Sequence, residues 1–142
     1  MIRVLVVDDH AVVRQSLRLL LSRDEDVACV AEAASVEEAR RLSESLEPDV
    51  ILLDVVMPGA KGVQEVPAML EAAPGARVAV LSMQDDPGYV SEAFEAGAAG
   101  YVLKQAADED LVTAVHEVAA GRRYVHPSLR ARVEAALAQG TS

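Results

Sequence analysis

Apart from aliphatic residues, the sequence contains few residues that could form a hydrophobic core or a covalent cross-link. Among 142 residues there are one cysteine, no tryptophan, one phenylalanine and three tyrosines, whereas alanine occurs 25 times. The single cysteine, Cys29, cannot form an internal disulfide, which agrees with a reducing compartment. No apolar run reaches the roughly 20 residues that span a bilayer, and no cleavable signal segment is recognisable. We expect a cytoplasmic protein with one aliphatic core and no membrane partner.

Positive charge is scarce and unevenly distributed. The chain has 13 Lys and Arg against 23 Asp and Glu, a formal net charge of -10. Residues 1–121 carry a net -13, whereas residues 122–142 carry four arginines against Glu134 alone, a net +3. Because nucleic-acid binding needs clustered Lys and Arg, we expect these 142 residues to bind no nucleic acid. The length fits one domain. We expect it to cover residues 1–121, with residues 122–142 as a separate basic segment.

Short apolar runs alternate with segments of helical spacing. The runs are four to six residues long and mostly lack alternation, as in strands buried on both faces of a parallel sheet. They occupy residues 2–7, 27–31, 50–53, 77–81 and 100–103. Helices are expected between them, including one over residues 64–73, and Ser35 with Glu38 forms a capping box for another. The pattern predicts a (βα)5 sandwich of three layers, with one more short helix over residues 127–138.

Polar side chains follow four of the predicted strands. Asp8 and Asp9 follow the first strand, Asp54 the third, Ser82 the fourth and Lys104 the fifth. Ligands of open parallel sheets bind beyond the carboxyl ends of the strands, so these groups are expected to converge there. Three neighbouring carboxylates would repel one another unless a cation lay among them. Mg²⁺ is the expected occupant, because it prefers oxygen ligands.

Such a site can perform phosphoryl chemistry. A carboxylate beside a metal ion can act as a nucleophile and form an aspartyl phosphate. An ammonium group and a hydroxyl would then stabilise the oxygens of the transferred group. Lys104 is one of only two lysines beside 11 arginines, which indicates a need for a compact point charge at that position. The other, Lys61, is expected to be a solvated loop residue. Each residue alone could equally be a helix cap or a surface charge; the combination carries the prediction.

Four segments carry a resemblance to a known family. DDH at 8–10, LLDVVMPGAKG at 52–62, LSM at 81–83 and GAAGYVLK at 97–104 resemble the receiver domain of bacterial two-component response regulators. DDH, GAAGYVLK and AAGRRYVHPSL at 119–129 are similar in particular to the NarL/FixJ branch, whose members carry a LuxR-type helix-turn-helix. The resemblance covers residues 2 to about 121 and implies a flavodoxin-like fold with a five-stranded sheet of order 2-1-3-4-5.

The resemblance implies a phosphoacceptor and its metal ligands. Asp54 would accept the phosphoryl group. Asp9 and Asp54 would bind Mg²⁺ directly, Asp8 mostly through water, and Val56 through its backbone carbonyl. The chain would catalyse only its own phosphorylation and dephosphorylation and would not otherwise be an enzyme. Val56 and Gln84 occupy positions that tune hydrolysis of the acyl phosphate in this family, so the lifetime of the phosphoryl group stays open.

The resemblance also implies a switch. Lys104 would contact the phosphoryl group, Ser82 would be the hydroxyl switch residue and Tyr101 the aromatic one. Added negative charge would recruit Ser82, and Tyr101 would follow inward. The alternative for Tyr101 is a core aromatic residue whose hydroxyl lies at the surface.

The implied partners lie partly outside the chain. A sensor histidine kinase would supply the phosphoryl group, and members of this branch dimerise, so a homodimer is among the expected states. A helix-turn-helix needs several dozen residues beyond the linker, so we expect residues 122–142 to lead to a DNA-binding domain of a longer protein. Three alternatives stay open. The chain could be a stand-alone receiver that acts through a protein partner, or a receiver whose phosphorylation is vestigial. It could also be an aspartyl-nucleophile phosphatase of the haloacid-dehalogenase type, although that family has DxD after its first strand.

Overall fold

The computed structural model describes residues 1–57 and 62–140 and shows strands alternating with helices. The strands are β1 (Ile2–Val7), β2 (Val27–Ala33), β3 (Val50–Asp54), β4 (Arg77–Ser82), β5 (Gly100–Leu103) and β6 (Tyr124–Val125). The helices are α1 (Ala11–Leu21), α2 (Val36–Leu46), α3 (Glu65–Ala72), α4 (Pro87–Glu95), α5 (Ala107–Ala119) and α6 (Pro127–Gly140). Short 3₁₀ turns, η1 (Gly62–Gln64) and η2 (Lys104–Ala106), precede α3 and α5.

The strands form one parallel sheet of order β2-β1-β3-β4-β5-β6. The predicted order 2-1-3-4-5 is confirmed, and the structure adds a sixth strand at the edge. Gly121, at φ 88°, turns the chain after α5, and the amide of Tyr124 then donates to the carbonyl oxygen of Ala99. A strand of two residues has too little sequence for an apolar pattern, which is why the sequence did not predict it.

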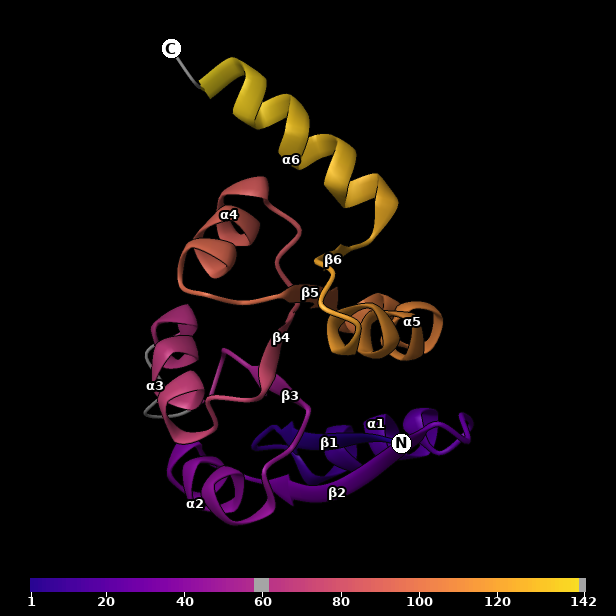
Figure 1. Ribbon diagram of the computed structural model, residues 1–142. Coiled ribbons are helices and arrows are strands. Elements are labelled where there is room, and N and C mark those ends of the chain that lie inside the picture. The colour runs from indigo at the N-terminus through magenta and orange to yellow at the C-terminus, as the bar shows by residue number, and fades with distance from the viewer. Residues whose placement is uncertain (58–61, 141–142) are drawn as a thin grey trace.

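Helices cover both faces of the sheet (Figure 1), as the predicted three layers require. On one face, α2, α3 and α4 bury an aliphatic cluster that includes Ile51, Val66 and Met69. On the other face, α1 and α5 bury a second cluster that includes Leu17 and Leu111. The strands β1, β3 and β4 are shielded by both layers, which explains why their sequences are almost continuously apolar. No helix within residues 1–57 and 62–140 has the length and apolar character of a membrane span.

Local sequence signals set the helix ends. The Ser35 hydroxyl accepts a hydrogen bond from the amide of Glu38 at 3.2 Å, and the Glu38 carboxylate accepts one from the amide of Ala34 at 2.7 Å. The predicted capping box is thus confirmed, although Glu38 reaches the residue before the cap. Asp86 caps α4 in the same way by accepting from the amide of Gly88 at 2.7 Å. The helix predicted over residues 64–73 is one residue shorter at each end, because Gln64 belongs to η1 and Ala73 is the C-cap.

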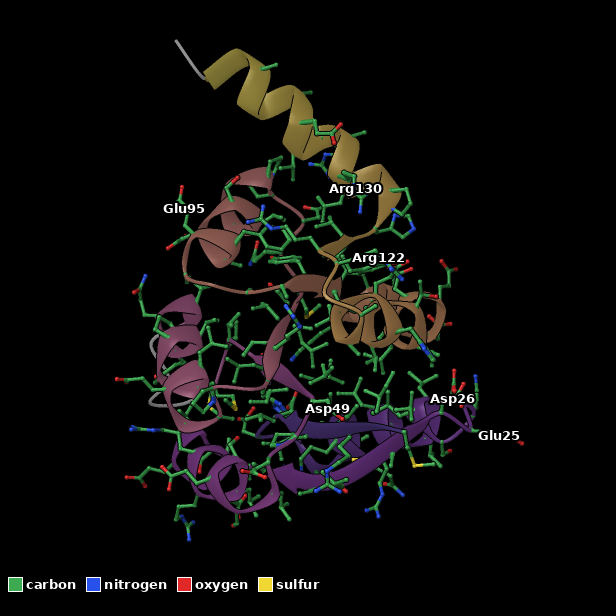
Figure 2. The ribbon with its side chains drawn as sticks, viewed as in Figure 1. Glu25, Asp26, Asp49, Glu95, Arg122 and Arg130 are labelled. Carbon is green, nitrogen blue, oxygen red and sulfur yellow. The ribbon has the colours of Figure 1, made fainter. Side chains whose placement is uncertain are left out.

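The final helix, α6, lies against α4 and extends beyond the sheet (Figure 1). Its residue Leu129 is 2% exposed and belongs to the same buried cluster as Val90 and Tyr101. Arg132 on α6 also lies 3.5 Å from Asp85, in the loop before α4. The start of the basic segment therefore contributes to the core of the domain. Arg130 lies near the N-terminal end of α6 (Figure 2).

Truncating Leu129 tests whether α6 shares this core. We expect Leu129→Ala to lower the free energy of unfolding by about 2 kcal/mol or more, because it removes buried methyl groups and leaves a cavity. Urea denaturation measures this loss. Leu19→Ala is the matched control, since Leu19 is 60% exposed and the same change there should cost about 0.5 kcal/mol or less. Equal losses in the two variants would show that α6 is not docked in solution.

The ionisation of Tyr124 in β6 is expected to lower the stability of the fold at alkaline pH. Burial, together with the negative charge of Asp110, raises the pKa of Tyr124 from 10.0 to about 12. The folded chain thus holds the phenolic proton more tightly than the unfolded chain does. The resulting stability is complete below pH 10.0 and is lost as the pH rises toward 12. Because the sequence has no tryptophan, tyrosinate absorbance can follow this directly. Tyr124→Phe should remove the titration step near 12, and Tyr89→Phe should retain it.

Candidate functional site

Three of the predicted site residues meet at the carboxyl ends of β1, β3 and β5. Asp8 follows β1, Asp54 is the last residue of β3, and Lys104 follows β5. The Lys104 Nζ lies 3.2 Å from Asp8 Oδ2 and 2.9 Å from Asp54 Oδ2. Both carboxylates are buried, whereas Lys104 is partly accessible. The parallel register, which pairs Val7 with Leu53, brings these residues together from distant parts of the chain.

The environment of Asp54 favours a reactive carboxylate held in place. Its Oδ1 accepts a hydrogen bond from the amide of Val56 at 2.9 Å, and its Oδ2 faces Lys104. Burial raises the pKa of Asp54 above its ordinary 3.8; the Val56 amide and Lys104 oppose that rise, and Asp8 adds to it. Burial alone would lower the pKa of Lys104, yet Asp54 and Asp8 outweigh it and the pKa is raised. Lys104 therefore stays protonated between the two acids.

Asp9 and His10 complete the acidic end of β1. Asp9 is partly accessible, and its Oδ1 lies 3.1 Å from Nδ1 of the exposed His10. Asp8, Asp9 and His10 offer ligand atoms that all lie within 4.8 Å of one another. The sequence predicted the two acids here and assigned no role to His10.

The oxygen atoms of this pocket fit a hard divalent cation. Asp8 Oδ2, Asp9 Oδ1 and Asp54 Oδ2 are buried and receive no directed hydrogen bond. Two of them face the Lys104 ammonium as ion pairs, which balances charge but leaves their lone pairs available. Since Mg²⁺ prefers carboxylate oxygen and retains water ligands, this donor set suits it. Val56, whose carbonyl is a predicted ligand, is 68% exposed beside Asp54, and its amide donates a hydrogen bond to the Asp54 carboxylate.

Ser82 and Tyr101 lie together beside the end of β4. Ser82 is 2% exposed, and its hydroxyl accepts a hydrogen bond from the amide of Gln84 at 3.0 Å. Tyr101 is also 2% exposed, and its hydroxyl donates to the carbonyl oxygen of Gln84 at 2.7 Å. The ring thus already lies inside the fold, and its hydroxyl is not at the surface. Both side chains hold the loop that joins β4 to α4.

Two residues of the site region escaped the sequence prediction. Arg14 of α1 donates from Nη1 to the backbone oxygen of Asp8 at 2.7 Å, and its Nε lies 3.4 Å from Glu32 of β2. Glu32 is the penultimate residue of β2 and so lies near the same edge of the sheet, which was the available signal. The predicted loop residue Lys61, with the residues from 58 onward that precede it, lies outside the described residues.

Fold and site together define a class of protein. A parallel sheet with this order, an acidic pocket at the carboxyl ends of β1 and β3 and a lysine after β5 make a receiver-type α/β domain. The chain belongs to the response regulator receiver domain family, whose model matches residues 4–116. It is thus a receiver domain of a two-component response regulator, of the NarL/LuxR type expected from the sequence.

Individual relatives agree with this assignment. The response regulator GacA of Pseudomonas aeruginosa is 38% identical over 129 residues, which are 91% of this chain and 60% of GacA. A LuxR-family two-component response regulator from Aurantimonas sp. SI85-9A1 is 36% identical, with a TM-score of 0.86 and coverage of 93% of this chain and 94% of that one. In a structure of two RcsB dimers bound to two parallel DNAs, the matching chain is 27% identical, with a TM-score of 0.83 and coverage of 94% and 68%. The chain spans about 60% of the length of the relatives such as GacA.

Proposed function

We propose that Asp54 accepts a phosphoryl group from a sensor histidine kinase in a Mg²⁺-dependent reaction. The observation that carries this proposal is the position of Lys104, whose ammonium lies 2.9 Å from Asp54 Oδ2 and 3.2 Å from Asp8 Oδ2. That arrangement sets a fixed positive charge beside a buried carboxylate. Asp8 Oδ2 and Asp54 Oδ2, which face Lys104, and the buried Asp9 Oδ1 could together hold a cation.

In this reaction a carboxylate oxygen of Asp54 forms the bond to phosphorus while the bond from phosphorus to the kinase histidine nitrogen breaks. The histidine leaves with the electron pair of that bond and takes up a proton. The Val56 amide orients the Asp54 carboxylate, and the Lys104 ammonium stabilises charge on the phosphoryl oxygens. Asp8, Asp9 and Asp54 would hold Mg²⁺, together with the backbone carbonyl of Val56; when bound, the ion would neutralise charge on the phosphoryl group. The chain would turn over no other substrate.

The switch in this proposal runs from Asp54 to the loop after β4. The phosphoryl group adds a charge of roughly -1.5 to -2 next to Lys104. The Ser82 hydroxyl, now bonded to the amide of Gln84, would turn toward that charge. Because the Tyr101 hydroxyl holds the Gln84 carbonyl, the loop and Tyr101 would move together. This motion would alter the surface formed by α4, β5 and α5.

The output in this proposal is transcriptional. We assign residues 1–121 to the receiver and residues 122–142, of which β6 and Leu129 pack against it, to a basic linker toward a helix-turn-helix domain of a longer protein that acts in the cytoplasm. The RcsB complex with DNA contains dimers of that protein, which supports dimeric DNA binding as the output. A receiver that acts through a protein partner is the second candidate, and the acidic net charge of -10 favours it for these 142 residues taken alone.

Labelling of the purified chain tests the proposed chemistry. With acetyl phosphate and Mg²⁺, intact-mass measurement should show one phosphoryl group per chain, and hydroxylamine should release it, as expected for an acyl phosphate. Chelation of the metal by EDTA should prevent the labelling. A wild-type chain that takes up no label with Mg²⁺ present would contradict the proposal, and steady hydrolysis of a small phosphate ester would favour the phosphatase alternative.

A further inference from the structure

Arg14 connects the ends of two strands beside the acidic pocket. Its side chain is 18% exposed, and Nη1 donates to the backbone oxygen of Asp8 at 2.7 Å. On the same guanidinium, Nε lies 3.4 Å from Glu32 Oε1. The other oxygen of Glu32, Oε2, accepts from Arg18 Nη1 at 2.8 Å. Glu32 and the Asp8 carbonyl therefore contact different nitrogens of the Arg14 guanidinium.

The Asp8 carbonyl belongs to the peptide plane that joins Asp8 to Asp9. Because that plane is rigid, a contact that fixes the carbonyl oxygen also fixes the direction in which Asp9 leaves Asp8. The other polar groups of Asp8 are also engaged: its amide donates to the oxygen of Ala33, and its Oδ1 accepts from the amide of His10. Only Oδ2, beside Lys104, receives no directed hydrogen bond. Among the described residues, Arg14 supplies the side-chain hydrogen bond to the carbonyl oxygen of Asp8.

We propose that Arg14, oriented by Glu32, is a positioning residue for the divalent-cation site of Asp8 and Asp9. The inference rests on the proposed function, because it assumes that these acids hold Mg²⁺. Arg14 makes no contact with the carboxylate oxygens of the pocket; it acts through the peptide plane. An arginine suits this role because its planar guanidinium can donate to two acceptors in different directions, whereas a lysine ammonium is a point charge.

The sign of the expected effect separates positioning from simple electrostatics. Removing a positive charge near a cation site should tighten Mg²⁺ binding by reducing repulsion. Loss of positioning should instead weaken binding, because Asp8 and Asp9 would no longer be held in the binding geometry. Groups that orient metal ligands typically affect metal affinity by about 10–100-fold.

Isothermal titration calorimetry of the purified chain with Mg²⁺ alone tests this inference. We expect Arg14→Gln to weaken Mg²⁺ binding at least about tenfold, and Arg14→Lys to fall between Arg14→Gln and the wild type. Arg18→Gln is the matched control, because Arg18 is bonded to the same Glu32 but makes no contact with Asp8; it should bind Mg²⁺ as the wild type does. In acetyl phosphate labelling, Arg14→Gln should raise the Mg²⁺ concentration for half-maximal rate while the rate at saturating Mg²⁺ changes little.

Each outcome decides one question. Unchanged or tighter Mg²⁺ binding in Arg14→Gln overturns the inference, as does equal weakening in Arg14→Gln and Arg18→Gln. Thermal unfolding in EDTA establishes that the variants are folded; if Arg14→Gln is not, Arg14→Lys decides, and wild-type affinity in that variant overturns the inference. A wild-type chain that binds no Mg²⁺ contradicts the proposed function itself, which is a separate result.

Discussion

Asp54→Asn is expected to abolish phosphorylation by acetyl phosphate and the binding of beryllofluoride in the presence of Mg²⁺. The amide keeps the shape of the carboxylate but has no anionic oxygen to form the bond to phosphorus. The substitution should not unfold the chain, because burial raises the pKa of Asp54 and its ionised form is therefore costly in the fold. Intact-mass measurement after incubation with acetyl phosphate gives the labelled fraction, and circular dichroism gives the unfolding midpoint.

Asp49→Asn is the matched control for this prediction. Asp49 immediately precedes β3, the strand that Asp54 ends, so the same chemical change is made at the opposite end of one strand (Figure 2). Asp49 accepts a hydrogen bond from the amide of Arg3 and has no contact with the pocket. It should be labelled like the wild type. Equal labelling of Asp54→Asn and the wild type would show that another residue is the acceptor.

Lys104→Met is expected to slow labelling by acetyl phosphate about 10²–10³-fold at saturating Mg²⁺. The reason is the loss of a preorganised cation where charge develops on the phosphoryl oxygens. The variant should also respond differently to pH. Because Lys104 holds the pKa of Asp54 down against burial and against Asp8, its removal raises that pKa further. The difference between the two chains should therefore grow as the pH falls, which rapid-quench labelling over a pH series measures.

Two further variants define the cause of this loss. Lys104→Arg keeps the charge but replaces the compact ammonium with a planar group, so its rate should lie between those of Lys104→Met and the wild type. Arg122→Met removes a positive charge beyond the other end of α5 and should not change the rate. If Arg122→Met slowed labelling as much as Lys104→Met, the effect would come from net charge rather than from the position of Lys104.

Much of the fold could be predicted because the signals are local. The runs that became β1, β3 and β4 are apolar on both faces, which few structures other than the central strands of a parallel sheet require. Ser35 with Glu38, and Asp86 before Pro87, mark helix starts by hydrogen bonds within a few residues. β6 was not predicted because two residues carry no periodicity, and its pairing with β5 depends on the turn at Gly121.

The candidate site was predictable in outline for a related reason. Because parallel strands all present their carboxyl ends at one edge, a residue that follows a strand is placed there whatever its distance in sequence. That rule predicted that Asp8, Asp54 and Lys104 lie close together. It could not say that Lys104 bridges both carboxylates, nor that Tyr101 is enclosed and bonded to Gln84, since rotamers and loop paths depend on packing against distant residues.

The sequence by itself determined the alternation of strands and helices, the acidic edge of the sheet and the family to which the chain belongs. The alternation and the acidic edge follow from periodicity, from caps and from residue types at strand ends, and the family follows from the resemblance of short sequence motifs; all of these signals are local. Only the tertiary structure decided that Arg14 donates a hydrogen bond to the carbonyl of Asp8, that Glu32 contacts Arg14, and that Leu129 of the basic segment lies in the core. Each of these contacts joins residues of different elements, and the geometry that allows them exists only once the sheet and its helices have assembled.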